Sequence, residues 1–309
     1  MVHTMCFLLY NENMKIFKKI VKWFIILILF LIFYSFGSTL FEHVQISQMV
    51  DEFKSRAYDS YELNGFTYHP VKREHDYELI DERNVFSDAA KMRPGVEGDV
   101  LAAQDSPFPY VPVIHEFVSF YFGGHAALVS GPNNIIQSTG VPPNGFLDFP
   151  HMWKVITHPG YDTDNSLSVA ATETNNYWLQ KMRNESHAEY PYYGEYYREK
   201  IFTLRPKYSD IATIDEEVDE LLDFGQSLVG RGLYNYLWIF DTQYKYYCSD
   251  LVSRAFDTMS KKTNRSYNLN QDGFITTIND IIISKDVYLT IFKETVNDEI
   301  NIYYLEDVV

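Results

Sequence analysis

Residues 124–138 read GHAALVSGPNNIIQS. The two apolar runs of this stretch are typical of strands, and the Ser-Gly-Pro-Asn-Asn segment between them is typical of a turn. We therefore predict a β-hairpin. With a three-residue loop, residue 137 lies opposite residue 127 or residue 125, depending on which residues form the loop. Both registers place His125 and Gln137 on one face, because side chains alternate along a strand.

The elements around this hairpin predict an α+β domain over residues 95–309. A short strand follows Gly98-Asp99, and a helix is expected over residues 111–122 before the glycines that precede His125. Further along the chain, apolar residues recur at helical spacing over residues 214–229 and again after Cys248. We expect a small antiparallel sheet packed on helices.

Cys248 is the candidate nucleophile. It stands at the start of the second of these helices, where unpaired backbone N–H groups and the helix dipole favour a thiolate. The alternative is a passive cysteine packed at a helix start, which is common for a lone thiol. The only other cysteine, Cys6, lies on the far side of the apolar N-terminal segment. We therefore expect no disulfide.

His125 is the best candidate for the general base, because two glycines before it let the backbone pass close to another element. Gln137, on the same face of the hairpin, could accept a hydrogen bond from Nδ1–H of the imidazole and hold Nε2 toward the thiol. His151 and His158 have no cysteine or carboxylate at ligand spacing, and HExxH, CxxC and EF-hand patterns are absent. No motif indicates a metal or a cofactor.

The N-terminal segment predicts membrane attachment. Residues 1–22 form a short basic leader with four lysines and one glutamate, and residues 23–41 contain no charge. As a helix, those 19 residues span about 28 Å, close to the thickness of a bilayer core. The preceding lysines place the N-terminus in the cytoplasm and export the rest. A cleavable signal sequence is the alternative, and it exports the domain as well.

The charge balance argues against nucleic acid as a partner. The formal net charge is −16, and because the leader carries +3, the rest of the chain carries −19. Such a body is repelled by nucleic acid and by anionic membrane surfaces. Residues 42–94 are polar and charged without a clear period, and we interpret them as a stalk ahead of the domain.

Four strings together resemble the permuted NlpC-type cysteine hydrolases of the YiiX/YaeF group. They are Gly98-Asp99-Val100-Leu101, Gly124-His125-Ala126, Ile136-Gln137-Ser138 and Tyr247-Cys248-Ser249-Asp250-Leu251-Val252. The resemblance implies a circularly permuted papain-like fold, in which the histidine strand precedes the cysteine helix. The chain departs from the family pattern at Gly124, where a serine is frequent, and at Gln137, where a glutamate is frequent.

The resemblance also implies acyl transfer: Cys248 attacks an amide or ester, and an acyl-enzyme forms and is hydrolysed. The expected substrate is a cell-envelope peptide or a lipid-linked acyl amide outside the cytoplasm. Two alternatives stay open. One is a lipid acyltransferase of the related permuted fold, and the other is a binding module that has lost its activity.

Overall fold

The computed structural model describes residues 2–106, 112–140, 149–164, 166–168, 170–179, 198–238, 243–270, 275–297 and 299–308. The chain divides into two compact units, Met1–Gln45 and Ile46–Val309. We call the second the folded unit. Helix α1 (Val2–Ser55) is continuous across the boundary and supplies its last turns to the folded unit.

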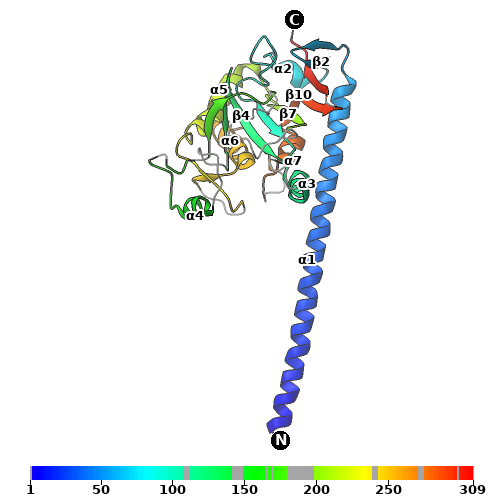
Figure 1. The fold of residues 1–309 in the computed structure, drawn as a ribbon, viewed down its shortest axis with the longest axis vertical. Helices are drawn as coiled ribbons and strands as arrows, with labels where there is room; N and C mark the ends of the chain where they lie inside the picture. Colours follow the sequence, from blue (N-terminus) through cyan, green and yellow to red (C-terminus); the bar gives the residue numbers. More distant parts are fainter. Residues whose placement is uncertain are drawn as a thin grey trace. The chain divides into compact units, whose positions relative to one another are not determined.

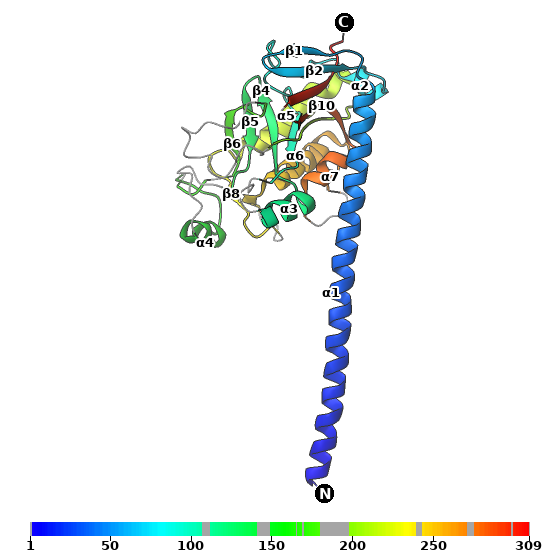
Figure 2. The same ribbon diagram turned by 45° about the vertical axis from the view of Figure 1, so that its right-hand side comes forward.

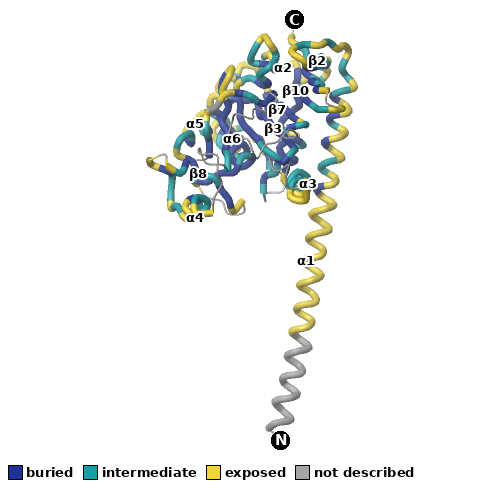
Figure 3. The backbone as a smooth tube through the Cα atoms, viewed as in Figure 1, coloured by how far each residue is buried: buried dark blue, intermediate teal, exposed yellow. Residues whose placement is uncertain are grey.

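The first unit contains the apolar helix that the sequence predicts. The part of α1 that begins at Phe17 is long and apolar enough to cross a membrane. Its large apolar side chains between Trp23 and Phe36 are exposed (Figure 3). Because such side chains are costly to leave in water, this stretch is suited to a lipid environment.

A nine-stranded sheet forms the centre of the folded unit (Figures 1 and 2), in the order β1-β2-β11-β10-β7-β3-β4-β5-β6. Neighbouring strands are antiparallel except β2 and β11, which run parallel. The strands are β1 (Tyr61–Leu63), β2 (Phe66–Val71), β3 (Val100–Ala103), β4 (His125–Gly131), β5 (Asn134–Gln137), β6 (Thr172–Asn175), β7 (Ile201–Pro206), β10 (Val287–Val296) and β11 (Glu299–Leu305).

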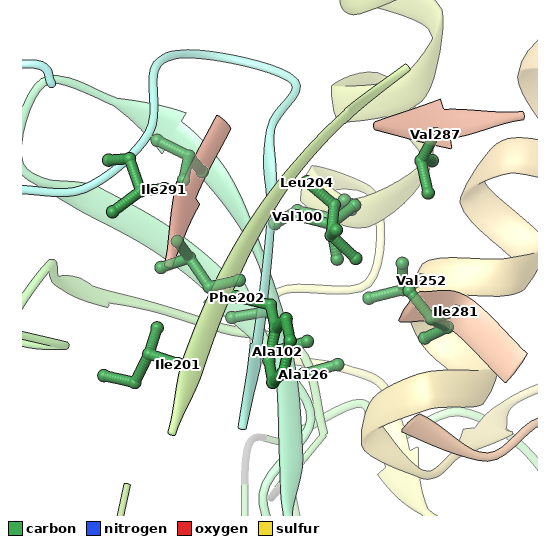
Figure 4. Packing of buried hydrophobic residues seen from close by; sticks show 14 of the residues in the cluster. Val100, Ala102, Ala126, Ile201, Phe202, Leu204, Val252, Ile281, Val287 and Ile291 are labelled. Carbon is green, nitrogen blue, oxygen red and sulfur yellow. The ribbon is translucent and has the colours of Figure 1, made fainter. Parts of the chain in front are cut away.

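The helices α5 (Ile214–Gln226), α6 (Cys248–Thr263) and α7 (Ile278–Ile283) pack against this sheet. In Figure 4, Val252 of α6 and Ile281 of α7 point toward Ala126 and its neighbours in the sheet. All three side chains are fully buried. Alanine on β4 leaves the room that allows α6 to pack close to the strand.

The remaining elements are short. They are α2 (Asp76–Ile80), α3 (Pro112–Tyr121), α4 (Phe149–Thr157), a 3-10 turn (Ile211–Thr213) and the parallel pair β8 (Leu233–Tyr234) and β9 (Lys245–Tyr246). The α+β class is confirmed, and the helices expected before His125 and from Cys248 onward are present. The sheet differs from the small antiparallel one that we predicted, because it is larger and includes a parallel pair.

The main correction concerns residues 42–94, which we interpreted as a stalk. Ile46 and Phe53 of α1 are buried in the core, and β2 pairs along its length with the C-terminal strand β11. The charged residues that suggested a stalk have partners inside the fold. Arg56, for example, donates two hydrogen bonds to the buried carboxylate of Glu78, at 2.8 and 2.9 Å. The folded unit therefore begins near Ile46 and not near residue 95.

A buried ion pair fixes the centre of the sheet. Arg205 of β7 is fully buried and donates to both carboxylate oxygens of Asp99, at 2.8 and 2.9 Å. Its guanidinium also donates to the carbonyl oxygens of Arg83 and Asn84. Because every one of these acceptors is fixed, the pair ties the segment before β3 to β7.

Candidate active site

Cys248 lies at the first residue of α6, as the sequence predicts. Tyr247 before it is extended and serves as the N-cap. Two contacts fix this turn to the segment before α7: Thr276 donates its N–H to the hydroxyl of Tyr247 at 3.0 Å, and Ser249 donates its hydroxyl to the carbonyl of Thr276 at 2.7 Å. The thiol is therefore held at a defined place at the helix tip, partly exposed.

The hairpin of β4 and β5 brings His125 and Gln137 together. Ala127 is the direct partner of Gln137, so His125 lies on the diagonal. The register shift in this hairpin falls between Val129 and Gly131, near the turn. The pairing from Val129 back to Ala127 is therefore continuous. Oε1 of Gln137 lies 2.9 Å from Nε2 of His125. We expected Gln137 to bind Nδ1, and the structure corrects this to Nε2.

Cys248 meets the hairpin where β5 ends. The ladder stops at Gln137, one residue before the position opposite Ala126, and the N–H of Ala126 lies close enough to the thiol of Cys248 to lower its pKa. At the same point Ser138 donates its hydroxyl to the carbonyl of Tyr246 at 2.7 Å. The thiol therefore lies beside the strand end that carries His125.

Burial decides the protonation of both groups. It raises the pKa of the Cys248 thiol, against the opposing effect of N–H groups from Ala126, Ser249 and Cys248 itself. Burial, together with the positive charge of Arg198, lowers the pKa of His125 to about 4, against the opposing effect of the hydrogen bond to Gln137. The resting pair is thus a neutral thiol and a neutral imidazole. Our expectation of a thiolate at the helix start is wrong here, because desolvation outweighs the helix dipole.

The neutral imidazole has a defined tautomer. Since the amide oxygen of Gln137 accepts only from a nitrogen that carries hydrogen, Nε2 is protonated and Nδ1 keeps its lone pair. Trp178 stacks on the ring, with centroids 5.8 Å apart and planes 13° apart. The guanidinium carbon of Arg198 lies 4.0 Å from the centroid of the Trp178 ring. We did not predict either residue from the sequence: Trp178 stacks on the imidazole, and the charge of Arg198 helps to lower its pKa.

A close backbone contact explains why position 124 is a glycine. A Cβ atom at this position would lie 1.8 Å from the carbonyl oxygen of Asp105, which is far inside van der Waals contact. The N–H of Gly124 also donates to the carbonyl of Ala103 at 2.9 Å. The serine that is frequent at this position in the resembling family does not fit this backbone.

A cavity of about 790 Å³ lies along α6 beside the cysteine. It does not include Cys248, His125 or Gln137, but its wall includes the neighbouring Tyr247. It carries charges of both signs, from Asp250, Arg254, Asp257 and Lys261, and its other lining side chains include aromatic rings and amides. Among the residues that the structure describes, no group of three or more His, Cys, Asp or Glu side chains could hold a metal ion.

No family model, curated protein or solved structure matches this chain.

Proposed function

We propose that this chain is a membrane-anchored cysteine hydrolase with a circularly permuted papain-like fold. The observation that carries the proposal is the position of Cys248 beside the start of β4: its thiol lies near the N–H of Ala126, directly after His125, and Nε2 of His125 lies 2.9 Å from Oε1 of Gln137. A nucleophile, a base with a free lone pair and an orienting group are the parts that such chemistry requires.

In the proposed reaction, Nδ1 of His125 takes the thiol proton as the sulfur of Cys248 attacks the carbonyl carbon of an amide or ester. The N–H of Cys248, in the first turn of α6, donates to the developing oxyanion. The imidazolium then gives its proton to the leaving amine or alcohol. Water, deprotonated by His125, hydrolyses the acyl-enzyme and restores the thiol.

The substrate that we propose is a peptide or acyl amide of the cell envelope. A chain bound to Cys248 can continue past Tyr247 into the cavity along α6, where polar groups of both charges and aromatic rings suit a peptide. The leader of four lysines places the N-terminus in the cytoplasm and the folded unit outside. Protease added to spheroplasts should digest the folded unit, and full protection would reverse this orientation.

A peptidyl and an acyl-chain chloromethyl ketone test the activity. On a Cys6→Ser background, intact mass should show one adduct that Cys248→Ala abolishes and His125→Ala slows. Equal labelling of the native protein and of the protein in urea would reduce Cys248 to an ordinary thiol. A preference between the two probes separates peptide from acyl amide.

The neutral resting pair favours one alternative, a binding module that has lost its activity. In that case the cavity along α6 still binds a ligand, but no probe forms an adduct faster with the native protein than with the unfolded one. A lipid acyltransferase would share the adduct, and it would pass the acyl group to an added amine instead of water.

A further inference from the structure

Helix α3 carries an apolar face that the folded unit leaves uncovered. Val113 is 82% exposed, Phe117 54% and Ile114 49%. At helical spacing these residues fall on one stripe with Tyr121. None of the ten residues of α3 is buried. An apolar stripe that faces away from the protein is unusual for a helix in water and is typical of an interaction surface.

Polar contacts with the rest of the folded unit hold α3 in this orientation. On the opposite side of the helix, Nδ1 of His115 lies 3.0 Å from the hydroxyl of Ser106, and Ser119 accepts from the N–H of Ser106 at 2.9 Å. Beyond the end of the helix, the N–H of Ile278 donates to the carbonyl of Phe122 at 2.9 Å. The apolar stripe is therefore presented outward by fixed contacts.

Helix α4 adds a second exposed apolar surface. Phe149 is 72% exposed and Trp153 is 56% exposed, and their rings stack with centroids 6.2 Å apart. In Figures 1 and 2, α3 and α4 lie at the same end of the folded unit. Aromatic side chains of this kind are enriched where proteins meet the headgroup region of a bilayer.

The length of chain between the apolar segment and the fold indicates what covers these surfaces. The uncharged run ends at Phe41, and the folded unit begins at Ile46 within the same helix. Four intervening residues allow about 8 Å of helix rise. An anchored chain therefore keeps the folded unit at the bilayer surface, where lipid is the most concentrated partner.

We propose that α3 and α4 dock the folded unit onto a lipid bilayer with neutral headgroups, and that their exposed side chains enter the boundary between headgroups and acyl chains. Neutral lipid is the occupant because the chain after the leader carries −19, which opposes an anionic surface. The inference rests on a retained N-terminal anchor and not on the chemistry of Cys248.

Docking has a consequence for the proposed function. Helix α3 ends at Tyr121, four residues before His125. A docked α3 brings the start of β4, and Cys248 beside it, to the membrane surface. An amide at the level of the headgroups, attached to a lipid, is the substrate that this placement favours. This last step rests on the proposed hydrolase activity.

Nitroxide labels on the full chain test the docking. The background is Cys6→Ser with Cys248→Ser, in nanodiscs of phosphatidylcholine. Single cysteines replace Phe117 on α3, Leu31 in the apolar segment and Leu79 on α2, which is 53% exposed. Accessibility to oxygen, which concentrates in lipid, is compared with accessibility to a water-soluble nickel complex. We expect the Phe117 label to resemble the Leu31 label and to differ from the Leu79 label.

Each other outcome overturns the inference in a distinct way. A Phe117 label as accessible to nickel as the Leu79 label excludes docking while leaving the anchor intact. A Leu31 label in water excludes the anchor itself. Dipolar broadening at Phe117 that disappears on dilution with unlabelled protein identifies a second copy as the occupant. Replacing a third of the lipid by phosphatidylserine should weaken the oxygen preference at Phe117, and a stronger preference would contradict the assignment of a neutral surface.

Discussion

Replacement of Gln137 by glutamate is the most direct perturbation of the proposed site. The side chain keeps its length, so an oxygen stays near Nε2 of His125, but that oxygen now carries negative charge. A carboxylate stabilises the imidazolium more strongly than the neutral amide of Gln137 does. The population of the imidazolium–thiolate pair should therefore rise, and the thiol of Cys248 should become reactive at lower pH.

The structure sets the size of this effect. Burial, with the charge of Arg198, lowers the pKa of His125 from 6.5 to about 4, which favours the neutral ring by about 3 kcal/mol. The oxygen of residue 137 lies 2.9 Å from Nε2, and an opposite charge this close raises a pKa by about 1 to 3 units. Each unit increases the ion-pair population about tenfold. We take the lower end, about tenfold, because the new carboxylate also repels the thiolate.

The assay is the rate of iodoacetamide alkylation at pH 7, followed by intact mass on a Cys6→Ser background. Gln137→Glu should react about tenfold faster than the parent. Gln137→Leu, which leaves the imidazole without its acceptor, should react more slowly, on the order of a hundredfold. A glutamate variant that is folded but no faster than the parent would refute the electrostatic reasoning. If Gln137→Leu reacts at the parent rate and His125→Ala is slow, Gln137 does not orient the base.

Three further predictions concern stability. Gly124→Ser should lower the free energy of unfolding by about 1 to 3 kcal/mol, because its Cβ would meet the carbonyl of Asp105; an unchanged urea midpoint would show that the backbone yields there. Arg205→Ala should cost about 3 to 5 kcal/mol by leaving Asp99 charged and buried, and a thermal midpoint within a degree or two of the parent would contradict the pairing. The lowered pKa of His125 contributes stability that is fully present above pH 6.5 and is lost as the pH falls through about 4. Urea titrations at pH 7 and pH 4 measure this loss of unfolding free energy, which should be about 3 kcal/mol in the parent and absent from His125→Gln. An equal loss in both proteins would show that the pKa of His125 is not depressed.

The features that the sequence predicted correctly are local. The hairpin of β4 and β5 follows from turn residues between two apolar runs, and its even register places His125 and Gln137 on one face without reference to the rest of the chain. The start of α6 at Cys248 follows from the apolar positions that come after it. In both cases the deciding residues lie within about fifteen positions of one another, where period and turn chemistry are informative.

The features that it missed depend on distant partners. Strand β2 lies between β1 and β11, and its register with β11 pairs Thr67 with Asn301, which is more than two hundred positions away. Likewise, Trp178 and Arg198 are more than fifty positions from His125 in the sequence and come close to it only in the folded chain. The number of residues around an imidazole sets its desolvation, and that number cannot be counted from the residues next to it in sequence.

A neutral resting pair of Cys248 and His125 is consistent with a neutral Gln137 beside it. Gln137 is 3% exposed, and a carboxylate at this depth is costly unless a positive charge faces it. With His125 uncharged in the resting state, glutamine satisfies Nε2–H without burying a charge, and its amide nitrogen lies 3.5 Å from the hydroxyl of Tyr177. In the proposed reaction, His125 must therefore remove the thiol proton while the sulfur attacks and not beforehand. Reaction then depends on a bound substrate that develops negative charge next to the N–H groups of α6. The ratio of reactivity toward a substrate analogue to reactivity toward iodoacetamide should therefore be far larger than in an enzyme with a preformed thiolate.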